Sequence, residues 1–398
     1  MRPTIAMLSC GAVLVAAIAT HSPVARGQTR ELRPGDPLAG ITPREMDEFR
    51  LGLDDFTEVE TSEEGLGPAF NGTSCAGCHS VPAIGGAGFV LETRAGYRDE
   101  DGGFRGLNAD GETLIHLFSI PTHSCQPTIP DDVNVIARRA PIPLFGAGLV
   151  EAIPDDTLLN LEDPQDRNRD GVSGRAALIT DVASRERRVG RFGWKAQHAT
   201  LIAFAADAYR NEMGITNDLF PREALFGIDD PLLRRCDVRP DPEDAVDRAT
   251  GRRGIDNFES FMRFLAPITR SHSDEGTRDG ERLFSAIGCD ACHVPVLSTG
   301  PSANPLFDRK PVALFSDLLL HDIGTGDAIR QGAAEANEIR TPALWGLRLR
   351  RPLLHDGGAV TIEDAIGRHR NEAELARRGF DRLPAQDRQR LLAFLRSL

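Results

Sequence analysis

The sequence predicts a mainly α-helical fold of two domains with long irregular loops. The chain of 398 residues is long enough for two domains that each bury a core. A short Cys-x-x-Cys-His motif occurs twice, at 75–79 and at 289–293, and apolar residues at helical spacing flank the second copy. Residues 97–191 are rich in Gly and Pro, so they are expected to form loops rather than long regular elements.

The N-terminus has the pattern of a secretory signal. A mostly apolar run over residues 5–19 is too short to span a bilayer and is followed by small residues. Cleavage is expected after Ala19 or after Gly27, and we assign residues 1–27 to the signal peptide. The mature chain is therefore expected in the periplasm. No later segment is long and apolar enough for a membrane span.

The composition narrows the range of partners. The chain carries 59 acidic and 46 basic residues, and its pI is about 5.3. Such a surface should repel nucleic acid and anionic lipid, whereas a basic redox partner is electrostatically compatible with it.

Seven cysteines divide into three groups. Cys10 leaves with the signal, and four belong to the two motifs. Cys125 and Cys236 remain as a pair in an oxidising compartment, so we predict a disulfide between them.

A polar, Gly-rich segment at 274–280 separates two helical patterns and is taken as the domain boundary. It follows an apolar helical pattern at 258–266. The predicted domains are therefore 28–273, which contains a loop-rich insertion, and 274–398.

The second domain is predicted to contain two helices that pack together. The pattern over 281–287 ends at Gly288, directly before the second motif, and so delivers that motif. A terminal helix is expected to begin at Pro384 and to bury one face lined by leucines at 391, 392 and 395.

The two motifs predict covalent haem. Two thiols at this spacing can add to both vinyl groups of one haem, and the adjoining His then becomes the proximal iron ligand. About 0.003 chance matches are expected from the composition, and two are present. A zinc site built from the four thiols would not need a His directly after the second Cys of each motif. A thioredoxin-like redox pair would lie in a βαβ pattern, and none surrounds either motif. We predict two cytochrome c-like haem domains with two covalent haem c groups, attached through Cys75, Cys78, Cys289 and Cys292, with His79 and His293 as the proximal iron ligands.

The C-terminal half resembles a known superfamily. The runs "RTPALW", "PLLHDGG" and "TIEDAI", at 340–366, are similar to a pattern of bacterial di-haem cytochrome c peroxidases and MauG-type enzymes. The resemblance covers both haem motifs and much of the second domain. The wider pattern "FNGTSCAGCHSVPAIGG", "RFGWKAQ", "NEMGITN" and "SDLLLHDIG" is more similar to the di-haem oxidoreductase branch.

The resemblance implies a distal ligand for the second haem. Related chains place Met or Tyr shortly after this run, and the same interval here leads to His369. Two imidazoles would give a low-spin iron with a lower potential than a Met-ligated one. The alternative is a solvent-facing helix residue between Arg368 and Arg370.

The resemblance also implies residues for the first haem. Related peroxidases carry a Trp between the haems, shortly before a Glu-Met pair, and Trp194 precedes Glu212 and Met213 in this way. Glu212 would be the general acid/base that moves a proton between the two oxygens of peroxide, and Trp194 the electron bridge. An exposed helix carboxylate and an aromatic packing residue are the alternatives.

Other histidines are candidates for capping the first iron or for contacting a haem. Related peroxidases carry a displaceable His in the loop after the first motif, whereas here no His follows His79 until His116. The resemblance therefore implies that the first haem is open, although four residues could still cap it: His116, His123, His198 and Met213. His321 and His355 are expected to contact a haem edge or propionate, and both could equally be core histidines.

A calcium loop is the last candidate. Asp166, Asn168 and Asp170 alternate in a Gly-bent loop, as ligands of Ca²⁺ do, but Ala177 stands at the twelfth position instead of Glu. An ordinary Asx-rich turn explains the same pattern. Related peroxidases hold calcium between the haems with a Thr whose position is Arg350 here, so any calcium is expected to be bound differently.

These expectations combine into a periplasmic di-haem peroxidase. Hydrogen peroxide would be reduced at the first haem with electrons that a small redox protein delivers through the second. The alternatives are a di-haem electron-transfer cytochrome without peroxide turnover, and an oxidase of an organic or thiol substrate.

Overall fold

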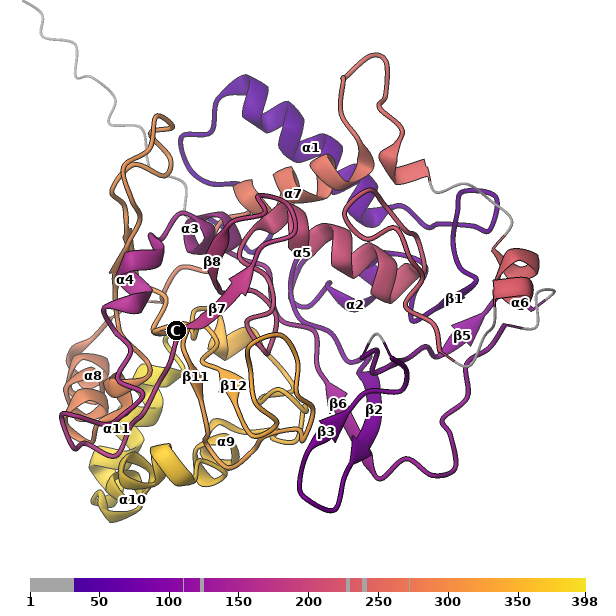
Figure 1. The fold of residues 1–398 in the computed structure, drawn as a ribbon. Coiled ribbons are helices and arrows are strands. Elements are labelled where there is room, and N and C mark those ends of the chain that lie inside the picture. Colours follow the sequence, from indigo (N-terminus) through magenta and orange to yellow (C-terminus); the bar gives the residue numbers. More distant parts are fainter. Residues whose placement is uncertain (1–31, 110, 122–124, 227–229, 238–241, 272) are drawn as a thin grey trace, which may run out of the picture. The chain divides into compact units, whose positions relative to one another are not determined.

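The computed structural model describes residues 32–109, 111–121, 125–226, 230–237, 242–271 and 273–398. They form one compact unit, drawn in Figure 1. Helical residues outnumber strand residues among them, and many residues lie in neither kind of element. The predicted signal peptide and His123 fall outside the described residues.

The first half of the unit is built on three packed helices, α1 (Pro43–Thr57), α5 (Leu201–Ala208) and α7 (Gly254–Phe264). A capping box formed by Thr42 and Glu45 starts α1. Where α1 crosses α7, a Cβ on Gly52 would lie 2.1 Å from the carbonyl oxygen of Asn257, so only glycine allows this approach. Phenylalanines of α1 and α7 form the core beside the first motif.

Short elements fill the rest of this half. The helices are α2 (Cys75–Cys78), α3 (Ala147–Glu151), α4 (Asp155–Leu159), α6 (Asp230–Cys236), the π-helix η1 (Tyr209–Met213) and the 3-10 helix η2 (Pro242–Asp244). The prediction of loops over 97–191 is borne out by elements of five residues or fewer after β2.

The strands are short and antiparallel. In the largest sheet, β2 (Glu92–Arg98) pairs with β3 (Phe104–Arg105), β4 (Leu114–Ile115) and β6 (Val135–Arg139). The other pairs are β1 (Ala69–Phe70) with β5 (Phe118–Ser119), β7 (Ala177–Thr180) with β8 (Arg187–Gly190), β9 (Leu297–Ser298) with β10 (Pro311–Val312), and β11 (Leu320–His321) with β12 (Ile339–Arg340).

The second half is built on α8 (Glu275–Ala286) and α11 (Ala385–Leu395), which lie against each other in Figure 1. A Cβ on Gly280 would lie 2.1 Å from the carbonyl oxygen of Arg390, and the Phe284 and Phe394 rings meet at 5.4 Å. The predicted packing of the terminal helix on the motif-bearing helix is confirmed. The remaining helices are η3 (Cys289–Ala291), η4 (Leu347–Leu349), α9 (Ile362–Gly367), η5 (Asn371–Ala373) and α10 (Glu374–Arg382).

The segment at 274–280 was predicted to separate two helical patterns, but most of it belongs to the second helix. It forms the first turns of α8, because the Asp274 carboxylate caps the helix by accepting from the Thr277 amide at 2.8 Å. Gly280 serves the close crossing with α11 rather than a turn. The predicted stop is confirmed, since Gly288 follows α8 with φ of +84°. The domain boundary after residue 273 stays a prediction.

Two further predictions can be compared with the structure. Cys125 and Cys236 are bonded to each other, with their Cα atoms 6.2 Å apart, so the predicted disulfide is confirmed. Among the described helices, none has the length and apolar character that a bilayer crossing requires.

Candidate active site: two cavities lined by cysteine and histidine

The first motif lines a cavity of about 170 Å³. The one-turn helix α2 carries Cys75 and Cys78, and the amide of His79 donates to the Cys75 carbonyl at 3.0 Å. The His79 Nδ1 donates to the carbonyl oxygen of Gly86 at 2.9 Å. This bond fixes the ring and leaves Nε2 as the free ligand atom.

The second motif repeats this geometry beside a larger cavity of about 630 Å³. The amide of His293 donates to the Cys289 carbonyl at 3.0 Å, and its Nδ1 donates to the carbonyl oxygen of Phe315 at 3.0 Å. An aromatic ring lies near each imidazole, Phe56 at 6.2 Å from His79 and Phe284 at 6.3 Å from His293. Both motifs therefore present a neutral imidazole with Nε2 unengaged.

His369 lines the same cavity as His293. It follows α9, and its Nδ1 donates to the Ala365 carbonyl at 2.8 Å, which again leaves Nε2 free. Burial, followed by the nearby His369, lowers the pKa of His293 to about 4. Burial also lowers the pKa of His369. The structure thus brings two neutral imidazoles to one cavity.

Glu212 lines the first cavity from a π-helical turn that continues α5. Such turns insert one residue into a helix and often occur at functional sites. Asn71 holds the carboxyl, with its Nδ2 donating to Oε2 at 2.8 Å. Burial and the neighbouring carboxylate of Glu92 raise the pKa of Glu212 to about 8. Glu212 therefore keeps its proton at neutral pH.

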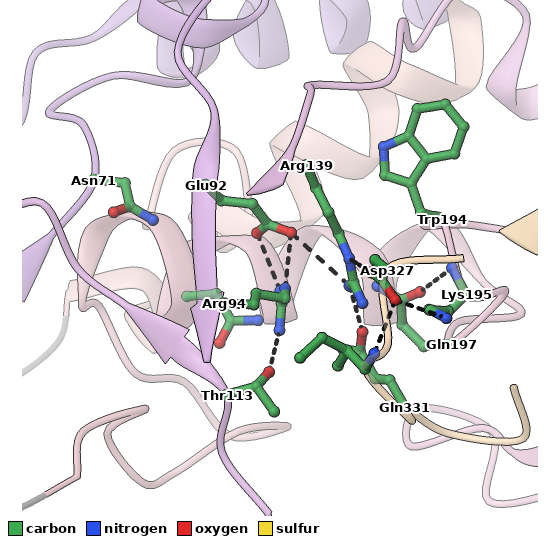
Figure 2. A network of polar contacts seen from close by, with 12 residues as sticks. Asn71, Glu92, Arg94, Thr113, Arg139, Trp194, Lys195, Gln197, Asp327 and Gln331 are labelled. Carbon is green, nitrogen blue, oxygen red and sulfur yellow. Dashed lines mark hydrogen bonds and ion pairs between the residues drawn. The ribbon is translucent and has the colours of Figure 1, made fainter. Parts of the chain in front are cut away.

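Glu92 belongs to a buried charge network shown in Figure 2. Its carboxylate pairs with Arg94 at 2.8 Å and lies 3.9 Å from Arg139. Burial raises the pKa of Glu92, but the two guanidiniums outweigh this and hold it below its ordinary value. Asp327 then pairs with Arg139 at 2.7 Å and with Lys195 at 2.9 Å. The network connects the first cavity to a loop of the second half.

Trp194 lines both cavities. Its side chain is 5% exposed, and its indole N–H donates to the carbonyl oxygen of Ala140 at 2.8 Å. The residue before Trp194 is held by Arg340 of β12, whose Nε donates to the Gly193 carbonyl oxygen at 2.8 Å. The His355 ring meets the indole edge-on at 6.1 Å. One indole therefore separates the two cysteine- and histidine-lined spaces.

The residues present fit two haems. Each cavity offers two thiols and a His with Nε2 free. The larger cavity lies within the range of about 300–1,000 Å³ that is usual for ligand sites, and Leu353, Leu354 and Phe380 give it apolar walls. Arg350, which also lines it, has buried nitrogens without a hydrogen-bond partner. The first cavity, at about 170 Å³, is smaller than this range, so its fit to haem rests on its donor atoms, which are the thiols of Cys75 and Cys78 and the Nε2 of His79.

The four motif thiols do not converge on one metal. They are unpaired and line different cavities. Burial raises the pKa of the Cys78 thiol to about 11 and that of Cys289 to about 12, so neither is a reactive thiolate at neutral pH. Among the described residues, the one group with metal-binding geometry joins Cys292 to Asp317 and His321.

The residues considered as caps for the first haem lie in different places. Met213 is buried and lines the first cavity. His198 and His116 do not line it: the His198 ring contacts Asp207 at 2.9 Å, and the His116 Nε2 donates to the Asn211 carbonyl at 2.9 Å. Met213 is therefore the one described candidate that the structure brings to this cavity.

His321 and His355 are both buried and both line the second cavity. His321 lies 2.8 Å from the carboxylates of Asp317 and Glu372, which engage its two ring nitrogens. Neither nitrogen is left for iron. The His355 ring contacts the Trp194 ring at the wall between the two cavities.

The loop considered for calcium binds its own backbone. The Asp166 carboxylate accepts from the Gly171 amide at 3.2 Å, and that of Asp170 accepts from the Val172 amide at 2.8 Å. Asn168 accepts from the Asp170 amide at 3.1 Å. The bonds of Asn168 and Asp170 reach the amide two residues on, as in Asx turns, which were the alternative explanation. Calcium stays a prediction.

Sequence reasoning missed the residues around Glu212. Asn71 stands four residues before Cys75, so its place beside the motif was a usable signal. Glu92 and Arg94 have the i, i+2 spacing that puts them on one face of a strand. Asp327 had no such signal, because it meets Arg139 across 188 residues of sequence.

Comparisons with known proteins point to one family. The model of a family described as "di-haem oxidoreductase, putative peroxidase" matches residues 123–398, which include Glu212 and the second motif. No curated protein matches the chain.

The solved structures that match are distant. Hydrazine synthase from Kuenenia stuttgartiensis is 16% identical, with 98% of this chain and 100% of that chain covered and a TM-score of 0.44. The di-haem peroxidase BthA from Burkholderia thailandensis is 14% identical, with 92% and 89% covered and a TM-score of 0.44. A MauG-like protein associated with microbial copper homeostasis is 18% identical, with 71% and 95% covered and a TM-score of 0.33. None of these likenesses assigns a role to this chain, because the identities and the TM-scores are low.

Proposed function

The chain belongs to the di-haem oxidoreductase family, and from this premise we propose that it reduces hydrogen peroxide at the first cavity. The difference between the two cavities is the observation that carries the proposal. The first combines one imidazole, His79, with the protonated carboxyl of Glu212, whereas the second combines the two imidazoles of His293 and His369. A site with one imidazole and an acid suits reaction with peroxide, and a site with two imidazoles suits electron transfer.

Peroxide reduction consumes two protons and two electrons and yields two waters. When bound, haem supplies the iron that takes up peroxide and exchanges electrons. His79 and His293 would hold the two irons from one side, and His369 would close the second. Trp194 lies between the cavities and provides the contact through which electrons would pass to the first.

Glu212 moves protons in this proposal. Asn71 fixes its Oε2, and the anionic Glu92 beside it keeps the proton on Glu212. Glu212 would deliver its proton to one oxygen of peroxide and take a proton from the other. The oxygen that gains the proton would leave as water, and the other would become the second water once two electrons and two further protons have been supplied.

The remaining assignments are proposed on separate grounds. The Cys125–Cys236 disulfide supports an oxidising compartment, and the apolar run at 5–19 supports export to the periplasm. Covalent attachment through the four motif thiols is supported by their spacing before His79 and His293. The net charge of −13 supports a basic protein as the electron donor.

The test is the Glu212→Gln variant, with Glu100→Gln as a control that changes an exposed carboxylate. Loss of a general acid/base should lower peroxide turnover about 10²–10⁴-fold, with both haems still attached by mass. Glu100→Gln should turn over peroxide as the wild type does. Equal turnover in all three proteins would remove Glu212 from the mechanism.

The second candidate, a di-haem electron carrier, is favoured by one observation: Met213 lies in the first cavity and could cap that iron. Ferric-state EPR separates the two functions. A peroxidase should show a high-spin signal that changes on addition of peroxide, whereas a carrier should be wholly low-spin. Met213→Leu should convert a carrier to high spin and leave the spectrum of a peroxidase unchanged.

A further inference from the structure

Arg350 is a buried cation without an anionic partner among the described residues. It directly follows η4, and the residue is 8% exposed. Its Nε and Nη2 have no hydrogen-bond partner. Burial lowers the pKa of Arg350 to about 10, and no carboxylate offsets this effect. A guanidinium stays charged even so, and a buried unpaired charge is costly. An anionic ligand at Arg350 would offset this cost.

The two unpartnered nitrogens define the chemistry of that ligand. Nε and Nη2 lie on one edge of the planar guanidinium, where two parallel N–H bonds match the two oxygens of a carboxylate. Other buried arginines differ in this respect: the Nε of Arg139 is bonded to Asp327, and that of Arg340 to the Gly193 carbonyl. Arg350 thus has a complete fork available for an anion.

Arg350 lines the larger cavity together with His293 and His369. Arg350 also makes a cation–π contact with Trp194, whose ring centre lies 5.2 Å from the Arg350 Cζ. The cation therefore stands at the wall between the two cavities. A carboxylate bound there would have to reach the same wall.

We infer that Arg350 binds a propionate carboxylate of the haem in the second cavity and turns that edge of the haem toward Trp194. The inference rests on the proposed function, because it requires haem in this cavity. Propionates are the anionic groups of a haem, and the remaining wall of the cavity is largely apolar. A small free anion such as phosphate would offer the same fork a similar ligand, and the experiment distinguishes these sources.

The experiment compares haem-loaded wild type, Arg350→Met, Arg350→Lys and Arg351→Met. The last variant removes the same charge one residue away, from an exposed side chain that does not line the cavity. The readouts are the propionate bending mode in the resonance Raman spectrum and the reduction potential of the low-spin haem. Neither depends on peroxide turnover.

Arg350→Met should shift the propionate mode and lower the potential, because a cation that opposes the ferric charge is lost. Arg350→Lys should shift the mode, because the fork is lost, but retain more of the potential. Arg351→Met should change neither readout. If Arg350→Met does not load haem, the Lys variant still decides through the Raman mode.

Two results would overturn the inference. One is a propionate mode that is the same in the Arg350 variants as in Arg351→Met. The other is a wild-type potential that follows added phosphate, which would assign the fork to a free anion. Failure of the proposed function is distinguishable from both, because it would appear as absent peroxide turnover, on which neither readout depends.

Discussion

At the scale of single residues, position along the chain and chemical surroundings were not equally predictable. The motif spacing and the family pattern led to His369 and Glu212, and the structure brings each to a cavity with a motif histidine. What raises the pKa of Glu212 could not be predicted in this way. That shift depends on burial and on Glu92, whose partners Arg94 and Arg139 come from two paired strands.

Glu212 should make the stability of the protein depend on pH. Its pKa is about 8 in the folded chain against 4.5 for the ordinary group. The folded state therefore binds this proton more tightly, and the resulting stabilisation is complete below about pH 4.5 and is lost as the pH rises toward 8. The free energy of unfolding of the wild type, relative to Glu212→Gln, should fall across this window in denaturant titrations. A difference that rose with pH would show that the carboxyl is ionised at rest.

Trp194 should carry electrons between the haems. Trp194→Phe removes the indole N–H that contacts Ala140 and leaves a smaller ring at the shared wall. Flash reduction of the second haem should then be followed by slower oxidation of that haem by the first. Trp345→Phe is the control, because the only other tryptophan lines neither cavity. Equal rates in both variants would reduce Trp194 to a packing residue.

At the scale of elements, helix existence was easier to predict than helix limits. The pattern after 281 revealed the motif-bearing helix, but its first turns were taken as a separating segment because they are polar and contain Gly276 and Gly280. The Asp274 cap is a local signal that could have moved the start. The contact between Gly280 and Arg390 involves a helix more than a hundred residues away, which no local pattern reports.

Two glycines of α8 should respond in opposite ways to alanine. In Gly280→Ala the new Cβ would lie 2.1 Å from the Arg390 carbonyl oxygen, so α8 and α11 must separate, at a cost of about 1–3 kcal/mol. In Gly276→Ala the nearest atom is 3.5 Å away, so the lower backbone entropy of the unfolded state should stabilise by about 0.4–1 kcal/mol. Urea unfolding measures both. Equal effects would mean that the two helices do not pack this closely in solution.

At the scale of the whole molecule, one covalent link was predicted by elimination. Once the motif and signal cysteines were assigned, Cys125 and Cys236 were the remaining pair. The network around Asp327 was not predictable, because its members come from three separate stretches of chain and share no local spacing.

The disulfide should stabilise the fold substantially. It joins residues 111 positions apart, and cross-links of such long loops restrict the unfolded chain. Replacing both Cys125 and Cys236 by Ser should lower the free energy of unfolding by about 2–5 kcal/mol. Denaturant titration of the double variant measures this loss, and wild type treated with reductant should show a similar one. An unchanged midpoint would mean that the described bond does not constrain the unfolded chain.

The ion pairs of Asp327 have a consequence for the order of synthesis. Arg139 and Lys195 are completely or almost completely buried, and Asp327 is the carboxylate closest to both. While a nascent chain has not yet reached residue 327, closing the first half would leave these two cations buried and poorly compensated, which is strongly unfavourable. We therefore expect the first half to close only together with the segment that carries Asp327.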